Sequence, residues 1–324
     1  DFYEETLAKV ESFGCKVLRL DAFAYLHKEI GESNFFNKPG TWNYLDRINE
    51  IAKKNDLILL PEIHAEYGLN LHDEVAKENF MIYDFFLPGL MIHTLEASNN
   101  KALLTWINEI LTKGYKTVNM LGCHDGIPVL DLKGKEINGS YNKGLLEDYE
   151  IEKIMNTVIE RGGRVKNLYD PSGKKISYYQ VNATFFSALG ENEQKLLLAR
   201  AIQMFMPGIP QVWYLDLFAG KNNYKAADKG GSGSHKEINR TTLSNEEIKQ
   251  GLQKDIVKNQ LKILRLRNTL NAFSGTMEIK KSTQFELKIL WKNQTQFAEL
   301  NANLATHSFS IYYSENNKTK TLVF

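Results

Sequence analysis

Charged and imidazole side chains follow three apolar segments of the sequence, at the points where those segments end. A charge is costly to bury at the end of a strand unless it is paired or used. One such position is more often a helix cap or a surface ion pair, but three in one chain indicate a site. The three pairs are Arg19 and Asp21, Glu62 and His64, and His124 and Asp125.

The carboxylates of this set suit the breaking of a glycosidic bond with retention. That reaction uses a carboxylate nucleophile and a carboxylic acid about 5 Å apart. We expect Asp21 to be ionised, because the neighbouring Arg19 guanidinium lowers a carboxyl pKa. Glu62 follows the apolar run 57–61, where desolvation would raise its pKa and suit it to acid/base work. Asp125 would hold sugar hydroxyls and stabilise positive charge in the transition state.

Strands that alternate with helices are expected to position these residues. The hydrophobic pattern predicts five strands, at residues 16–20, 57–60, 83–87, 115–121 and 209–218. It predicts helices at residues 3–13, 41–54, 71–77, 101–112, 147–160 and 193–206, with a mixed segment at 178–189. This alternation is typical of a parallel α/β sheet, and the carboxyl ends of parallel barrel strands share one face.

The pattern changes near the C-terminus. A long helix is predicted at residues 245–268, and residues 277–324 alternate apolar and polar positions, which indicates a small antiparallel β-domain. We therefore expect a catalytic domain at 1–273 and a β-domain at 274–324. The segment 230–234, Gly-Gly-Ser-Gly-Ser, lacks the surroundings of a nucleotide loop and is predicted to be a flexible linker.

Composition excludes several classes of function. The chain of 324 residues is 43% hydrophobic and 24% charged, as in globular proteins, and its net charge of +1 gives no reason to expect nucleic acid or a membrane surface as a partner. Two cysteines cannot form a disulfide framework, which favours a reducing compartment, so we expect a cytoplasmic protein. No apolar run reaches the roughly 18 residues of a transmembrane helix.

The residues also carry a resemblance to a known family. "VLRLDAFAY", "LLPEIH" and "LGCHDGIPVLDL", in this order, resemble three signature segments of the α-amylase superfamily. Longer stretches resemble its sucrose phosphorylase branch, among them "YDFFLPGLMIHTL", "YYQVNATFFSALG", "PGIPQVWYLDLFAGKNN" and "EINR". The resemblance runs from residue 1 to about residue 273. It implies a (β/α)8 barrel enzyme in which inorganic phosphate, in place of water, attacks a glucosyl-enzyme and gives α-D-glucose 1-phosphate.

The resemblance implies roles for individual residues and no metal or organic cofactor. Asp21 would be the nucleophile, Glu62 the acid/base and Asp125 the transition-state stabiliser. Arg19 and His124 would bind the glucosyl unit. The residues expected around the acceptor and phosphate subsite are Tyr25, His64, Gln180 and Arg240.

Simpler interpretations stay open for some of these residues. Tyr25 and Gln180 are also typical of packing or strand-edge positions, and Arg240 is typical of a solvated surface. His64 follows Glu62 by two positions and would face the same side if the strand continues.

The sequence departs from the family in its length. We find no equivalent of the family's earlier half, and we count five barrel strands where closure takes eight. The chain is therefore expected to be the C-terminal part of a barrel enzyme, with a missing N-terminal half or a homodimer as open possibilities.

The loop that contains "DPSGKKISYYQVN" is basic. Sucrose-specific members tend to carry an acidic residue where Ser177 stands. Lys174, Lys175 and Ser177 would suit a phosphorylated acceptor through charge attraction and hydrogen bonding. We therefore expect sucrose or sucrose 6-phosphate, with inorganic phosphate, as substrates. A retaining α-glucosidase or transglucosidase on the same scaffold, and an inactive fragment or scaffold, remain alternatives.

Overall fold

Five short parallel strands form the centre of the molecule. The computed structural model describes residues 2–169, 175–229, 231–315 and 318–324, and the side chains of 166–179 and 231–233 lie outside its description. Strand β1 (Val17–Leu20) pairs in parallel with β2 (Ile58–Pro61). Strands β3 (Ile82–Asp84), β4 (Thr117–Asn119) and β9 (Ile209–Pro210) form a second parallel sheet. Each of the five overlaps a predicted strand.

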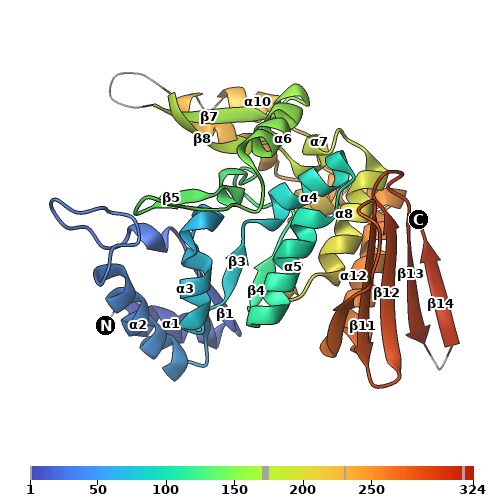
Figure 1. The fold of residues 1–324 in the computed structure, drawn as a ribbon, viewed down its shortest axis with the longest axis horizontal. Coiled ribbons are helices and arrows are strands. Elements are labelled where there is room, and N and C mark those ends of the chain that lie inside the picture. The colour runs from blue at the N-terminus through green and yellow to red at the C-terminus, as the bar shows by residue number, and fades with distance from the viewer. Residues whose placement is uncertain (1, 170–174, 230, 316–317) are drawn as a thin grey trace.

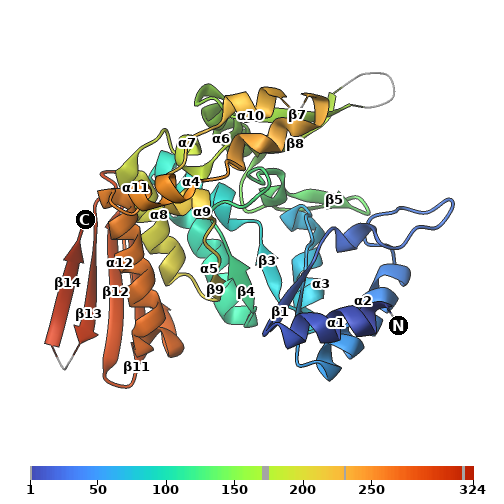
Figure 2. The same ribbon diagram turned by 180° about the vertical axis from the view of Figure 1, so that it is seen from behind.

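Helices connect the central strands, as the alternation predicts (Figures 1 and 2). Helix α5 ends at Gly114, whose positive φ of 67° suits a residue without a side chain. Helix α6 begins with a capping box made by Glu147 and Glu150. The main helices are α1 (Phe2–Ser12), α2 (Gly40–Lys54), α3 (Leu71–Lys77), α4 (Leu87–Ala97), α5 (Lys101–Lys113), α6 (Asp148–Glu160) and α8 (Glu193–Phe205).

Shorter elements surround the carboxyl ends of the central strands. Two hairpins lie here, β5 (Lys135–Ile137) with β6 (Ser140–Asn142), and β7 (Arg164–Tyr169) with β8 (Lys175–Asn182). The short helices are η3 (Leu130–Leu132), α7 (Phe185–Ala188), α9 (Tyr214–Leu217), α10 (Tyr224–Lys229) and η4 (Gly231–Asn239).

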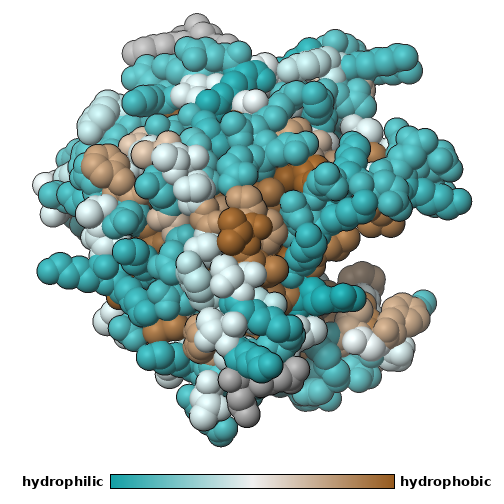
Figure 3. Space-filling view, turned by 90° about the vertical axis from the view of Figure 1, so that its right-hand side faces the viewer, coloured by the Kyte–Doolittle hydropathy of each residue, from teal (hydrophilic) through white to brown (hydrophobic). Residues whose placement is uncertain are grey.

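The C-terminal residues form the predicted antiparallel sheet. Its order is β10 (Thr276–Ile279), β11 (Glu286–Asn293), β12 (Gln296–Asn303), β13 (Phe309–Glu315) and β14 (Lys318–Val323). The Trp291 indole of β11 donates to the Phe205 carbonyl at 2.8 Å, and this sheet shares one hydrophobic core with α4, α5 and α8. The C-terminal sheet lies on the right-hand side of Figure 1. Seen from that side, the surface is mainly hydrophilic, with apolar residues near its middle (Figure 3). The expected domain boundary after residue 273 stays a prediction.

The structure shortens three of the predicted strands, and the 115–121 strand is limited to Thr117–Asn119. The 83–87 strand ends at Asp84, and α4 begins at Leu87, because the Asp84 carboxylate accepts hydrogen bonds from the backbone N–H groups of Phe86 and Leu87, each at 3.1 Å. The 209–218 strand is limited to Ile209–Pro210, and residues 214–217 form helix α9. Proline has no N–H to extend a ladder, which helps to end the strand there.

Two other predictions near the C-terminal half are also corrected. The long helix 245–268 is divided into α11 (Asn245–Gly251) and α12 (Asp255–Thr269). A side chain at Gly251 would begin 2.5 Å from the Phe218 ring, so the break lies where the backbone passes close to an aromatic side chain. Residue 230 of the predicted linker lies outside the described residues, and residues 231–234 belong to η4, in which Ser234 is buried. Within the described part of the chain, each helix is too short or too polar to cross a membrane.

Candidate active site

One guanidinium joins the two carboxylates that follow β1 and β2. Arg19 lies on β1 opposite Leu60 of β2, so its side chain reaches the residues after both strands. Its Nη1 lies 2.7 Å from Asp21 Oδ1, and its Nη2 lies 2.7 Å from Glu62 Oε2. Glu62 Oε2 also accepts a hydrogen bond from the Ala22 backbone N–H at 2.9 Å. The sequence predicted the pairing of Arg19 with Asp21, and the structure adds the pairing with Glu62.

The two carboxylates differ in their exposure to solvent. The Asp21 side chain is 74% exposed, whereas the Glu62 side chain is 10% exposed. Burial lowers the pKa of Arg19, but the charges of Glu62 and Asp21 raise it by more, so the guanidinium remains positive. The arrangement therefore offers one accessible carboxylate and one shielded carboxylate beside a permanent positive charge.

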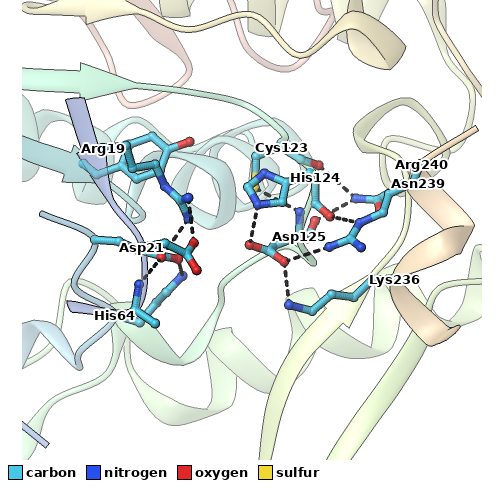
Figure 4. A network of polar contacts seen from close by, with 12 residues as sticks. Arg19, Asp21, His64, Cys123, His124, Asp125, Lys236, Asn239 and Arg240 are labelled. Atoms are coloured by element: carbon cyan, nitrogen blue, oxygen red, sulfur yellow. Dashed lines mark hydrogen bonds and ion pairs between the residues drawn. The ribbon is translucent and has the colours of Figure 1, made fainter. Parts of the chain in front are cut away.

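A second charged group surrounds Asp125 in the loop after β4. His124 Nε2 lies 3.3 Å from Asp125 Oδ2, while Lys236 Nζ and Arg240 Nη2 lie 2.5 and 3.4 Å from Oδ1. Burial raises the pKa of Asp125, but the hydrogen bond from Lys236 and the nearby positive charges lower it by more, so the pKa lies below its ordinary value. Asp125 is thus held as an anion. Figure 4 shows this group facing Arg19, Asp21 and His64 across an open space.

Residues 236–240 reach this loop because their side chains bond to its backbone. Asn239 Nδ2 donates to the carbonyl oxygens of Cys123 and Asp125, at 3.0 and 2.7 Å. Arg240 Nε donates to the His124 carbonyl at 2.6 Å. Sequence reasoning named Arg240 from the "EINR" segment but missed Asn239 and Lys236, although Asn239 lies in the same segment.

His64 lies between two acidic side chains. Its Nδ1 is 3.0 Å from Asp131 Oδ2, and its Nε2 is 3.7 Å from Glu62 Oε1. The ring stacks on Phe85 with centroids 3.5 Å apart. Contact with Glu62 shows that both side chains face the same side of the site. Asp131 and Phe85 were missed by sequence reasoning, although Asp131 lies within the quoted "VLDL" stretch.

Tyr25 and Gln180 line a cleft of about 350 Å³ together with Glu62, His64 and Asp131. Tyr25 also packs against the Phe35 ring at 5.3 Å, so it combines a packing contact with an exposed position. Gln180 is buried, and a side chain at Gly126 would begin 2.7 Å from its Oε1 and from Asn182 Oδ1, which favours a glycine after Asp125.

The proposed acceptor-loop residues fall outside what the structure describes. Lys174 lies outside the described residues, and the side chains of Lys175 and Ser177 are likewise outside the description. The described backbone places Lys175 and Ser177 on β8, paired with Tyr169 and Leu168 of β7.

Two trios of described side chains have the donor types of a metal site, and one of them, unlike His27, Glu29 and Glu32, lies in the candidate active site. Ligand atoms of Cys123, His124 and Asp125 lie within 4.8 Å of one another. Burial raises the pKa of the Cys123 thiol to about 12, although metals bind the thiolate. Asp125 is already engaged by Lys236 and Arg240. The trio is therefore poorly suited to a cation, and we assign no metal to it.

Comparisons with known proteins give a consistent set of relatives. The chain is 53% identical to a sucrose 6(F)-phosphate phosphorylase of Ilumatobacter coccineus, over 99% of this chain and 61% of that protein. It is 33% identical to a sucrose phosphorylase of Streptococcus mutans, over 98% of this chain and 63% of that protein. No family model matches the chain. The chain thus spans about three fifths of the length of these curated relatives.

Solved structures of a phosphorylase and of an α-amylase are also similar to this chain. The crystal structure of a sucrose 6F-phosphate phosphorylase from Thermoanaerobacter thermosaccharolyticum matches with a TM-score of 0.86 and 32% identity, covering 99% of this chain and 63% of that one. An α-amylase from H. orenii matches with a TM-score of 0.58 and 13% identity, covering 99% of this chain and 62% of that one, and shows a shared fold. The fold is therefore of the α-amylase type, with a C-terminal antiparallel sheet.

Proposed function

The chain belongs by homology to the sucrose phosphorylase group of α-amylase-type enzymes, and from this premise we propose that it carries the catalytic residues of a retaining disaccharide phosphorylase. The proposed substrates are sucrose or sucrose 6-phosphate and inorganic phosphate. The products are α-D-glucose 1-phosphate and fructose or fructose 6-phosphate. The observation that carries the proposal is the bridge from Arg19 to both Asp21 and Glu62.

In the first half of the proposed reaction, the exposed Asp21 carboxylate attacks the anomeric carbon of the glucosyl unit. An ester bond to Asp21 forms while the glycosidic C–O bond breaks, and Glu62 gives its proton to the leaving fructosyl oxygen. Asp125, held as an anion, stabilises the positive charge that develops on the sugar ring. Arg19 and His124 bind the glucosyl unit at the two sides of this site.

In the second half, phosphate replaces water as the nucleophile. A phosphate oxygen forms a bond to the anomeric carbon, the ester bond to Asp21 breaks, and Glu62 takes up the phosphate proton. Phosphate is an anion, so it requires positive or proton-donating groups near Glu62. The side chains proposed to surround it and the departing fructose are Tyr25, His64, Gln180 and Arg240, to which the contacts with Asp125 add Lys236.

We propose that sucrose 6-phosphate, with its phosphate on the fructosyl unit, is the preferred disaccharide substrate. Lys174, Lys175 and Ser177 would contact its phosphate. Two relatives at 53% and 33% identity, both sucrose 6(F)-phosphate phosphorylases, support this choice. A comparison of kcat/KM for sucrose and sucrose 6-phosphate, before and after replacement of both lysines by alanine, decides it.

We further propose that β1, β2, β3, β4 and β9 belong to an eight-stranded barrel and that the other strands are supplied from outside residues 1–324, by the same polypeptide or by a partner. Five parallel strands and the match over 63% of a solved phosphorylase chain support this interpretation. The division into domains at residue 273 and a cytoplasmic location are part of the same proposal.

The decisive test is the release of glucose 1-phosphate by the full-length protein. We expect sustained fructose release only when phosphate is present, and we expect D21N to lose most turnover and to form no glucosyl-enzyme detectable by mass spectrometry. The matched control is D56N, since Asp56 is exposed and has a positive φ of 51° that asparagine tolerates. Sustained fructose release without phosphate would favour the glucosidase or transglucosidase alternative, and normal phosphorolysis by D21N would remove Asp21 from its role.

A further inference from the structure

Asp131 is a buried carboxylate that the proposed reaction does not use. It lies in the short helix η3, after the loop that carries Asp125, and only 8% of the residue is exposed. A buried carboxylate is costly unless a partner offsets its charge. The partner that the structure provides is His64.

The contacts of His64 fix the orientation of its ring. Asp131 Oδ2 lies 3.0 Å from Nδ1, and an ionised carboxylate can only accept, so Nδ1 carries a proton. Phe85 stacks on one face of the ring at 3.5 Å between centroids, with an angle of 27° between the planes. The ring therefore directs Nε2 toward Glu62 Oε1, at 3.7 Å, on the wall of the cleft.

The charges around His64 favour its second proton. Burial lowers the pKa of His64, but the carboxylates of Asp131, Glu62 and Asp125 raise it by more. These carboxylates come from η3, from the end of β2 and from the loop after β4. The facing positive charges are already engaged, Arg19 by Asp21 and Glu62, and Lys236 and Arg240 by Asp125.

We propose that Asp131 is a positioning residue that holds His64 as an imidazolium, with its Nε2–H directed to the cleft beside Glu62, where it binds the incoming inorganic phosphate. The inference rests on the proposed function, in which phosphate is the acceptor. In the second half-reaction the anionic phosphate approaches the Glu62 carboxylate, and a positive charge next to both reduces their repulsion. Loss of the Asp131 charge leaves His64 in place but neutral over a wider range of pH.

The first measurement is the pKa of His64 by NMR titration of the protein with labelled histidine. We expect a value above the ordinary value of about 6.5 in the wild type and a lower value in D131N. Asparagine keeps the size of the side chain and an oxygen that accepts from Nδ1, but it carries no charge. A wild-type value at or below the ordinary one overturns the inference without any variant, and so does an unchanged value in D131N.

The second measurement is the binding of inorganic phosphate and its use as acceptor. We expect D131N to weaken phosphate binding, and to raise the KM for phosphate, by about tenfold, the size of one charge-assisted hydrogen bond. The loss should be larger at alkaline than at acidic pH, because acid restores the proton on His64. The single burst of fructose released without phosphate, which reports formation of the glucosyl-enzyme, should change little.

Two controls keep the inference separate from a fault in folding and from the proposed function. E150Q neutralises a partly buried histidine–carboxylate pair, in which His93 Nε2 lies 3.1 Å from Glu150 Oε1, and should leave phosphate binding unchanged. In a protein that already carries H64N, D131N should have no further effect on phosphate binding. A lowered His64 pKa with unweakened phosphate binding overturns the inference. A protein without phosphorolysis whose phosphate binding still depends on Asp131 retains the inference and loses the proposed function.

Discussion

At the scale of single residues, the site is governed by how positive charges are shared among carboxylates. Arg19 contacts both Asp21 and Glu62, and Lys236 and Arg240 both contact Asp125. Each carboxylate that is proposed to work as an anion therefore has a basic neighbour. Glu62, proposed to exchange a proton, is also the most shielded, since it lies behind Arg19 and Ala22.

Lys236 permits a test of this arrangement through pH. Its hydrogen bond is the main contribution that lowers the pKa of Asp125 against the effect of burial. In K236M the pKa of Asp125 should rise, so the anion that stabilises the transition state is lost at a higher pH. We expect the acidic limb of the kcat/KM profile to shift to a higher pH than in the wild type. K236R should largely restore the profile.

The control for this test is K133M, because Lys133 forms an exposed ion pair with Asp148 away from Asp125. It should leave the acidic limb of the profile unchanged. An acidic limb of K236M that coincides with that of the wild type would show that Lys236 does not set the charge of Asp125.

At the scale of elements, the sequence predicts the five parallel strands because each is a short apolar run between helices. Their lengths were overestimated where burial continues beyond the strand, as at Met120 and Leu121, which are buried but lie after β4. Asp21 and Glu62 were predictable because they directly follow β1 and β2, and Asp125 because it lies in the loop after β4. Asp131 and Lys236 were not, since their partners are 67 and 111 residues away in the sequence.

The turn from β3 into α4 depends on one buried carboxylate. Asp84 accepts from the backbone of Phe86 and Leu87 and from the Trp106 indole at 3.0 Å. Burial nevertheless raises the pKa of Asp84 from 3.8 to about 6. The folded state then keeps a proton that the unfolded state has already released, so this contribution to stability is present at low pH and is lost as the pH rises through about 6.

D84N should remove this pH dependence. Between about pH 5 and about pH 7.5 the free energy of unfolding of the wild type should fall relative to that of D84N by about 1 kcal/mol. Urea unfolding of both proteins at the two pH values measures the difference, which is independent of any constant cost of placing an amide beside Trp106. D148N, at an exposed position of α6, is the control. Equal slopes for wild type and D84N would show that Asp84 does not titrate in this range.

At the scale of the whole molecule, apolar residues are exposed where the two parallel sheets meet. A groove of about 660 Å³ runs along the amino ends of the central strands, lined among others by Val17, Ile58 and Ile209. These three side chains are exposed, although each belongs to a strand. Strand edges and apolar patches that are exposed to solvent promote self-association.

Residues 1–324 expressed alone should therefore self-associate and show poor solubility. We expect sedimentation velocity to reveal oligomers that increase with concentration, because pairing of two such grooves buries apolar area worth roughly 25 cal/mol per Å². The double variant I58T/I209T should shift this equilibrium toward monomer, since threonine keeps the β-branched shape but is more polar. I30T is the matched control, because Ile30 is fully exposed in a loop and does not line the groove. A wild-type chain that stays monomeric at all concentrations, or an equal response to I30T, would show that the groove does not drive association.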